Sequence, residues 1–224
     1  MCDMNEFVLQ ERMIESRDWA TVLFTFCFVL IAVNRSVFSL RFTEFSRLAI
    51  SDKYIKIYKD SGNITNSFTI SFFFVQLVSF TFFIQFLLSY FGKSEKTSWV
   101  TFVQIFTFLG FFILSKYLTE KIIATSFNIE EFNEQFNLQK VNYRTYIGML
   151  LLPVNAVLFY NSAPHPIVVY SILGLIISGS VYSYLITLKA YQNLIVGKLF
   201  YFILYLCTLE IAPYYFMYYW FTKS

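Results

Sequence analysis

Long apolar stretches alternate with shorter polar ones along this chain, and this pattern predicts helices that cross a lipid bilayer. A helix rises about 1.5 Å per residue, so about 20 apolar residues cross the hydrocarbon core. Six stretches reach or approach that length, at residues 19–40, 68–91, 99–117, 143–162, 167–188 and 199–221. The pattern therefore predicts an all-α fold, a polytopic transmembrane helix bundle of six spans, with residues 1–224 forming a single membrane domain.

The fourth stretch is short and carries a proline. Its apolar part, Tyr146–Tyr160, is too short to cross a bilayer, so we extend the predicted span to residues 143–162. Proline lacks a backbone N–H and clashes with the preceding turn, so Pro153 predicts a kink in this helix. The carbonyl that such a kink frees is expected to be satisfied by Asn155 or by a neighbouring helix.

Two of the connections between the stretches are long and mix charged with apolar residues. Residues 41–67 alternate basic with aromatic and aliphatic residues, and residues 118–142 combine an apolar side with an acidic one. Both patterns predict backbone that lies on the membrane surface.

Composition supports a lipid environment. The chain is 57% hydrophobic and only 14% charged, with a mean hydropathy of +0.57, whereas about a quarter of the residues of a soluble domain are charged. A water-soluble core of this size cannot hide that much apolar surface. The basic residues do not gather on one broad face, so no nucleic-acid partner is expected.

The lysines and arginines predict an orientation, because cytoplasmic connections carry an excess of them. With the N-terminus outside the cytoplasm, twelve basic residues fall on the cytoplasmic side and five on the outer side, and the opposite orientation reverses this ratio. The sequence therefore predicts both termini outside the cytoplasm. The first apolar run lies far from the N-terminus and follows acidic residues, so we expect it to remain as an anchor rather than a cleaved signal.

One acid, Glu210, lies in the middle of the last predicted span. An ionised acid at the bilayer centre costs roughly 3 kcal/mol on insertion scales, so we expect Glu210 to be neutral or hydrogen-bonded, with Asn155 among the candidate donors. Arg35 lies about 9 Å away in depth and is expected to reach the inner interface instead. Pro213 frees the carbonyl of Leu209 beside the acid. This arrangement is typical of a kinked helix that locks packing and also of an ion site in a discontinuous helix.

The fifth span carries small residues at helical spacing. Gly174 and Ser178 form one pair four residues apart, and Gly179 and Ser183 form another. Small residues at this spacing let two helix backbones approach closely. They predict either packing within the chain or an interface with another subunit.

The first span opens with three residues suited to a membrane interface. Trp19 is expected to anchor the helix there, and Asp18 suits the positive end of the helix dipole. Together with Arg17, they are candidates for contact with a partner outside the cytoplasm.

No catalytic or metal-binding pattern is present in the sequence. It contains no HExxH, no GxSxG and no phosphate-binding loop. Cys2, Cys27 and Cys207 form no CxxC motif, and we expect the last two to act as small packing residues. We therefore expect a non-enzymatic protein with no cofactor and no metal site, and the sequence assigns no small-molecule substrate.

Three groups of residues give the chain a resemblance to a known family. They are Arg17-Asp18-Trp19, Leu150-Leu151-Leu152-Pro153 after Gly148, and Tyr205-Leu206-Cys207-Thr208-Leu209-Glu210-Ile211-Ala212-Pro213. In these groups the chain resembles a Bacteroidetes inner-membrane family of unknown function, with similar length and six spans. Tyr201 stands where that family often has a histidine, which argues against a histidine partner for Glu210. The resemblance implies a location in the bacterial inner membrane and no particular activity.

These observations lead to two functional expectations. The first is a structural or accessory subunit of a bacterial envelope complex, such as secretion or gliding machinery, with the bilayer and other membrane subunits as partners. The alternative is a small proton- or ion-coupled carrier that uses Glu210.

Overall fold

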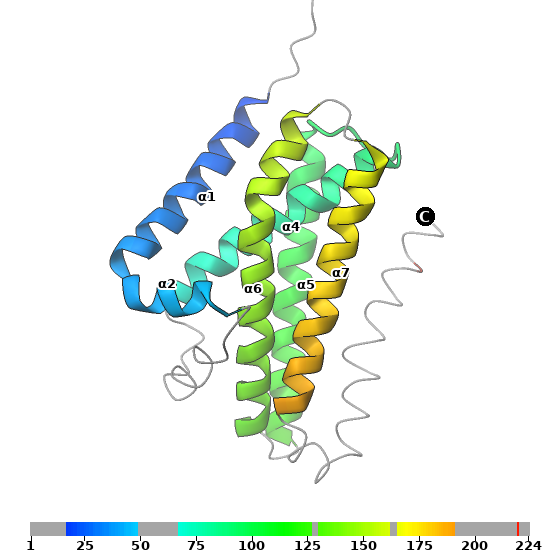
Figure 1. Ribbon diagram of the computed structural model, residues 1–224. Helices are drawn as coiled ribbons and strands as arrows, with labels where there is room; N and C mark the ends of the chain where they lie inside the picture. The colour runs from blue at the N-terminus through cyan, green and yellow to red at the C-terminus, as the bar shows by residue number, and fades with distance from the viewer. Residues whose placement is uncertain (1–16, 49–66, 127–129, 162–164, 191–218, 220–224) are drawn as a thin grey trace, which may run out of the picture.

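The computed structural model describes residues 17–48, 67–126, 130–161, 165–190 and 219, and their regular structure is helical throughout. The helices are α1 (Asp18–Val37), α2 (Ser39–Ser46), α4 (Ser67–Tyr90), α5 (Trp99–Ser126), α6 (Glu130–Tyr160) and α7 (Pro166–Ala190). Figure 1 shows them as an elongated bundle with α2 lying across the end of α1. The predicted all-α fold is confirmed for this part of the chain.

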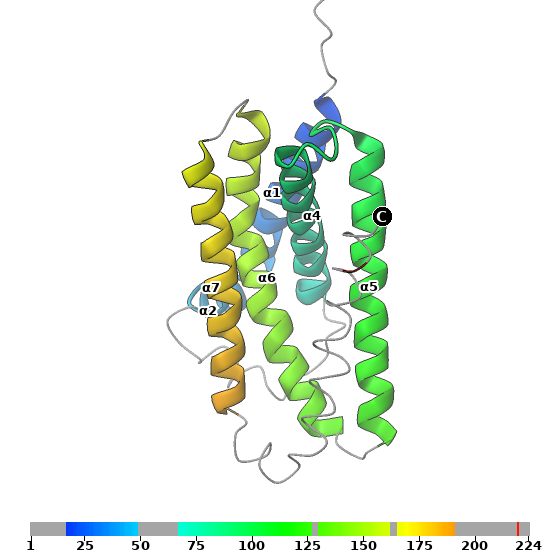
Figure 2. The same ribbon diagram turned by 90° about the vertical axis from the view of Figure 1, so that its right-hand side faces the viewer.

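Helix α4 is the centre of the bundle. It contacts α1, α5 and α6, whereas α7 packs against α6 on the far side. The order α7, α6, α4, α5 is visible across Figure 2. Consecutive long helices run in opposite directions, so the α4–α5 and α6–α7 connections lie at the same end as the start of α1 (Figure 1).

Four helices, α1, α4, α5 and α7, are long and apolar enough to cross a membrane. The fourth predicted span falls within α6, which is not among these four because its polar residues continue into the apolar half of the helix. The sixth predicted span, 199–221, lies outside the described residues apart from Tyr219. The structure therefore supports a helical membrane protein, while the six-span topology and the orientation of the termini stay predictions.

Helices α5 and α6 are longer than the spans predicted for them. They take up residues 118–126 and 130–142, most of the segment predicted as a surface connection. No glycine or proline interrupts these residues, so nothing in the local sequence ends either helix. Helices α5 and α6 contact each other, and the former connection contributes the buried residues Ala124 of α5 and Phe136 of α6.

The first helix ends earlier than predicted, at Val37 instead of residue 40. The chain turns at Phe38 and continues as α2, which covers the beginning of the predicted connection 41–67. Phe45 and Leu48 are buried in a cluster with Phe68 and Phe72 of α4. This apolar contact fixes α2 against the beginning of α4.

The α4–α5 turn is defined by standard capping chemistry. Gly92 has a φ of 71°, and the N–H of Lys93 donates to the carbonyl of Leu88 at 2.9 Å, which ends α4 in a Schellman motif. The hydroxyl of Ser98 accepts from the N–H of Thr101 at 3.3 Å and so caps the start of α5.

Aromatic rings join four helices at this end of the bundle. The ring of Trp19 stacks on Phe82 at 5.7 Å and meets Trp99 and Phe159 edge-on, at 5.1 and 6.0 Å. Its Nε1 donates to the carbonyl of Thr97 at 3.2 Å. We call this region, with Phe102, the aromatic end, and the opposite end, where α5 finishes and α6 begins, the basic end.

Helices α4 and α6 approach each other closely at Gly148. A Cβ atom placed on Gly148 would stand 2.9 Å from Cγ and 3.0 Å from the backbone Cα of Gln76. Real Cβ atoms essentially never show the first distance, and the second is tighter than nine in ten real Cβ contacts, so a larger residue at this position would force the neighbouring atoms of α4 to shift. One turn further on, Leu152 is fully buried against the same helix pair.

Replacing Gly148 by alanine is expected to separate α4 from α6. The new methyl group meets backbone, which cannot move aside as a side chain can, so we expect the free energy of unfolding to fall by about 1–3 kcal/mol. Unfolding of the purified chain in mixed detergent micelles measures this. Gly174→Ala is the matched control, since no atom lies within 4 Å of its Cβ position. Equal stability of the two variants would contradict the close contact.

Candidate functional site

Two groups of polar residues lie inside the bundle, and the first of them joins α4 to α6. Thr145 donates to Oε1 of Gln76 at 2.8 Å. Nδ2 of Asn155 donates to the backbone carbonyl of Ser79 at 2.7 Å and to its hydroxyl at 3.1 Å. All four residues are buried, and buried polar groups are costly unless they are hydrogen-bonded.

Asn155 does not play the role expected from the sequence, in which its side chain would satisfy the carbonyl freed by Pro153. Its amide N–H groups bind α4, not the carbonyl freed by Pro153 in its own helix. Thr145, Gly148, Leu152 and Asn155 follow one another at intervals of three and four residues, so they lie on one face of α6. This face is the contact with α4, and its polar members hold the helix register.

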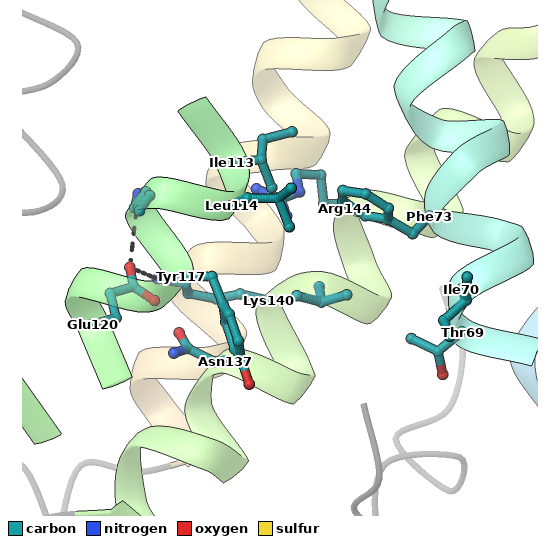
Figure 3. Close-up of a pocket in the computed structure, with 12 residues that line it drawn as sticks. Thr69, Ile70, Phe73, Ile113, Leu114, Tyr117, Glu120, Asn137, Lys140 and Arg144 are labelled. Atoms are coloured by element: carbon teal, nitrogen blue, oxygen red, sulfur yellow. Dashed lines mark ion pairs between the residues drawn. The ribbon is translucent and has the colours of Figure 1, made fainter. Parts of the chain in front are cut away.

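The second polar group surrounds a cavity of about 240 Å³ toward the basic end, between α4, α5 and α6. Glu120 of α5 is only 4% exposed. One of its carboxylate oxygens lies 3.6 Å from Nζ of Lys140 on α6 and 4.0 Å from Nζ of Lys116 on its own helix. Figure 3 shows these ion pairs as dashed lines, and Arg144 of α6 also lines the cavity.

The lining of this cavity is positively charged on one side and apolar on the other. The charged residues are Lys116, Glu120, Lys140 and Arg144, which sum to +2. The remaining lining residues are Thr69, Ile70 and Phe73 of α4, Ile113, Leu114 and Tyr117 of α5, and Asn137 and Val141 of α6.

Sequence reasoning missed this cavity because it placed residues 118–142 on the membrane surface. A signal was nevertheless present. Lys116 and Glu120 are four residues apart, and so are Lys140 and Arg144, which places each pair on one face of a helix. Only the tertiary structure shows that these two helix faces pack against each other.

The predicted interfacial residues lie at the aromatic end. Arg17 precedes α1 and is half-buried, and Asp18 is exposed in the first turn. Trp19 packs inward in the aromatic cluster. Arg35 is exposed in the last turn of α1, at the opposite end of that helix.

The small residues of α7 divide between two faces. Gly179 approaches Ile147 of α6, whose Cδ1 lies 3.8 Å from the Cβ position, and Ser183 lines the same groove between α6 and α7. Gly174 and Ser178 are exposed on a different face. One small-residue pair therefore packs within the chain, and the other points away from α6.

Glu210 and Pro213 lie outside the described residues, so the ion site that they suggest stays a prediction from sequence. Among the residues that the structure does describe, no group of three His, Cys, Asp or Glu side chains lies close enough to hold a metal ion.

The fold and its buried polar contacts define an all-helical protein compatible with a membrane. The chain belongs to the family described as a domain of unknown function, DUF4271, which matches residues 20–221. Neither a curated protein nor a solved structure matches it. The predicted membership of an uncharacterised family is thus confirmed.

The interhelical bond of Asn155 is open to a direct test. Asn155→Ala removes both contacts to Ser79, and we expect the free energy of unfolding in micelles to fall by about 1 kcal/mol, as for other interhelical hydrogen bonds in membranes. Ser79→Ala removes only the hydroxyl contact and should cost less. Ser178→Ala, whose hydroxyl bonds within its own exposed helix, is the control. If Asn155→Ala costs no more than this control, the bond does not join the helices.

Proposed function

We propose that the protein is a non-enzymatic, multi-pass protein of a bacterial inner membrane that serves as a structural or accessory subunit of an envelope complex. The observation that carries this proposal is the exposure of the apolar faces of α5 and α7. Only 6% of the most apolar stretch of either helix is buried, compared with 61% in α4. These faces need lipid or other membrane helices around them.

The buried polar groups support a structural role. Thr145 and Asn155, both buried on α6, donate their hydrogen bonds to α4. In the described part of the chain, these side chains hold two helices together and do not line the cavity. The hydrogen bonds that they donate are accounted for by assembly of the bundle, whereas Oδ1 of Asn155 accepts none among the described residues.

The proposed topology has six spans and places both termini outside the cytoplasm. Its orientation is supported by the charge difference between the two ends of the described bundle. Three basic residues belong to the aromatic end, namely Arg17, Lys93 and Lys96. Eight lie toward the other end, namely Arg35, Arg41, Arg47, Lys116, Lys121, Lys140, Arg144 and Lys189. An excess of this kind favours the cytoplasmic side.

The outward face of α7 suits contact with a partner helix. Gly174 and Ser178 are small and exposed, and Leu175 beside them is 71% exposed. In lipid, helix association depends on close van der Waals contact, which small residues permit. We propose this stripe as the contact with a neighbouring membrane subunit.

Two serines of α7 provide a matched test. Ser178 and Ser180 are both exposed, and each hydroxyl bonds to a carbonyl of its own helix. Only Ser178 lies in line with Gly174. We expect Ser178→Leu to lower the yield of assembled complex on the order of tenfold, about 1.4 kcal/mol, because the larger side chain separates the helices. Ser180→Leu should leave assembly unchanged.

The measurement is native mass spectrometry of the full-length chain, purified in mild detergent from the membranes of its own host. The expected result is a fixed stoichiometry with other membrane subunits. A chain that purifies only as a monomer, or two variants that assemble equally well, would overturn the proposal.

A further inference from the structure

We infer that α2 is a membrane anchor that lies along the lipid interface at the basic end, with Leu40 among acyl chains and with Arg35 and Arg47 against the phosphates of anionic phospholipids. The sequence predicted only that the segment beginning at residue 41 lies on the membrane surface. The inference goes beyond the proposed function, since it needs only that the bundle sits in a bilayer. Its support comes from the direction, the depth and the exposed side of α2.

The direction of α2 suits a helix that lies in the plane of the membrane. The chain turns at Phe38, and Figure 1 shows α2 lying across the end of α1 instead of continuing it. One side of α2 is occupied within the chain, because Phe45 is buried against Phe68 and Phe72 of α4. The helix is therefore fixed against the bundle on that side, and its opposite side is exposed.

The depth of α2 matches a boundary of the hydrocarbon core. Trp19 belongs to the aromatic end, and tryptophan is enriched at membrane interfaces. At helical rise, Arg35 lies roughly 24 Å along α1 from Trp19, and Phe38 lies roughly 28 Å from it. The hydrocarbon core is about 30 Å thick. With Trp19 at one boundary, the turn at Phe38 therefore falls near the other, where acyl chains give way to lipid phosphates.

Leu40 is the apolar contact between α2 and the membrane. Its side chain is 82% exposed, more than any other large hydrophobic side chain that the structure describes. Val33 and Val37, which precede it on α1, are also more than half exposed. Apolar surface of this kind is stabilised by removal from water. The exposed apolar side of α1 thus continues across the turn, and acyl chains are the medium that suits it.

The charge around Leu40 suits an anionic lipid. Residues 35–47 contain three arginines and one glutamate, a net charge of +2. Arg41 lies over the ring of Phe68, at 4.8 Å from its centre. Arg35 and Arg47 are exposed, and in the described part of the chain neither side chain forms an ion pair or a hydrogen bond. Their guanidinium groups are suited to bidentate contact with phosphate, and the cytoplasmic leaflet carries anionic lipids.

The first test measures the depth of Leu40 with a fluorescent probe. Leu40→Cys is labelled with an environment-sensitive dye in the full-length chain, in a background of Cys2→Ala, Cys27→Ala and Cys207→Ala. The labelled chain is reconstituted in vesicles of phosphatidylglycerol and phosphatidylcholine. We expect a loss of emission when a part of the lipid carries a quencher in its acyl chains, because the probe lies among those chains.

Two matched probes separate this inference from the proposed membrane location. Phe111→Cys, on the exposed side of α5 and roughly 18 Å from Trp99, should be quenched in any inserted bundle. Ser126→Cys, roughly 40 Å from Trp99, should stay in water and keep its emission. A quenched Phe111 probe with a Leu40 probe that responds no more than the Ser126 probe would overturn the inference alone. If the Phe111 probe also stays unquenched, the membrane location falls with it.

The second test keeps the native cysteines and measures the role of the two arginines. Native mass spectrometry follows the full-length chain in detergent, titrated with phosphatidylglycerol or with phosphatidylcholine of the same acyl chains. We expect tighter binding of the anionic lipid. Arg35→Gln with Arg47→Gln should lower that affinity by roughly 25-fold, at about fivefold for each basic residue.

The control for this double variant is Lys93→Gln with Lys121→Gln, which removes the same charge away from α2 and should leave the affinity unchanged. Equal affinity of the unsubstituted chain for the two lipids, or an equal loss in the two double variants, would overturn the inference.

Discussion

The contact between α4 and α6 is the constraint on which the rest of the structure depends. The absence of a side chain at Gly148 lets the backbone of α6 approach that of α4 at Gln76. At this separation Thr145 and Asn155 reach polar groups on α4. In lipid, apolar side chains gain little from meeting each other instead of acyl chains, so close packing and interhelical hydrogen bonds must supply the specificity. The other long helices then pack around this pair.

The two ends of the bundle use different chemistry. At the aromatic end, Trp19 gathers rings from α4, α5 and α6, and Nζ of Lys96 donates to the carbonyls of Leu158 and Asn161 at the end of α6. At the basic end, α5 and α6 continue together, and their charged residues meet around Glu120. The first end is thus held together by packed aromatic rings, whereas the second contains a cavity lined by four charged residues of two helices.

Much of the fold could be predicted from the sequence, because helix formation in an apolar stretch is a local property. The predicted spans 68–91 and 167–188 agree closely with α4 and α7. The lengths of α5 and α6 could not be predicted in the same way. The pattern of residues 118–142 fits a surface helix as well as it fits the facing sides of two packed helices. Which of these residues become buried depends on the neighbouring helix. Glu120 is the clearest example. An acidic residue in a polar segment is expected to be solvated, but Glu120 is buried and pairs with Lys140.

The sequence by itself predicted a lipid medium and most of the helices, because hydrophobicity and helix length are sums over neighbouring residues. It also marked the residues with special chemistry, such as Asn155, Gly148 and the small residues of α7. Only the tertiary structure decided what each of them contacts. Gly148 lies at a close contact between α4 and α6, Gly174 and Gly179 lie on an outer and an inner face of α7, and four charged residues of two helices line one cavity. Contacts of this kind depend on the crossing and register of helices, which no single stretch of sequence specifies.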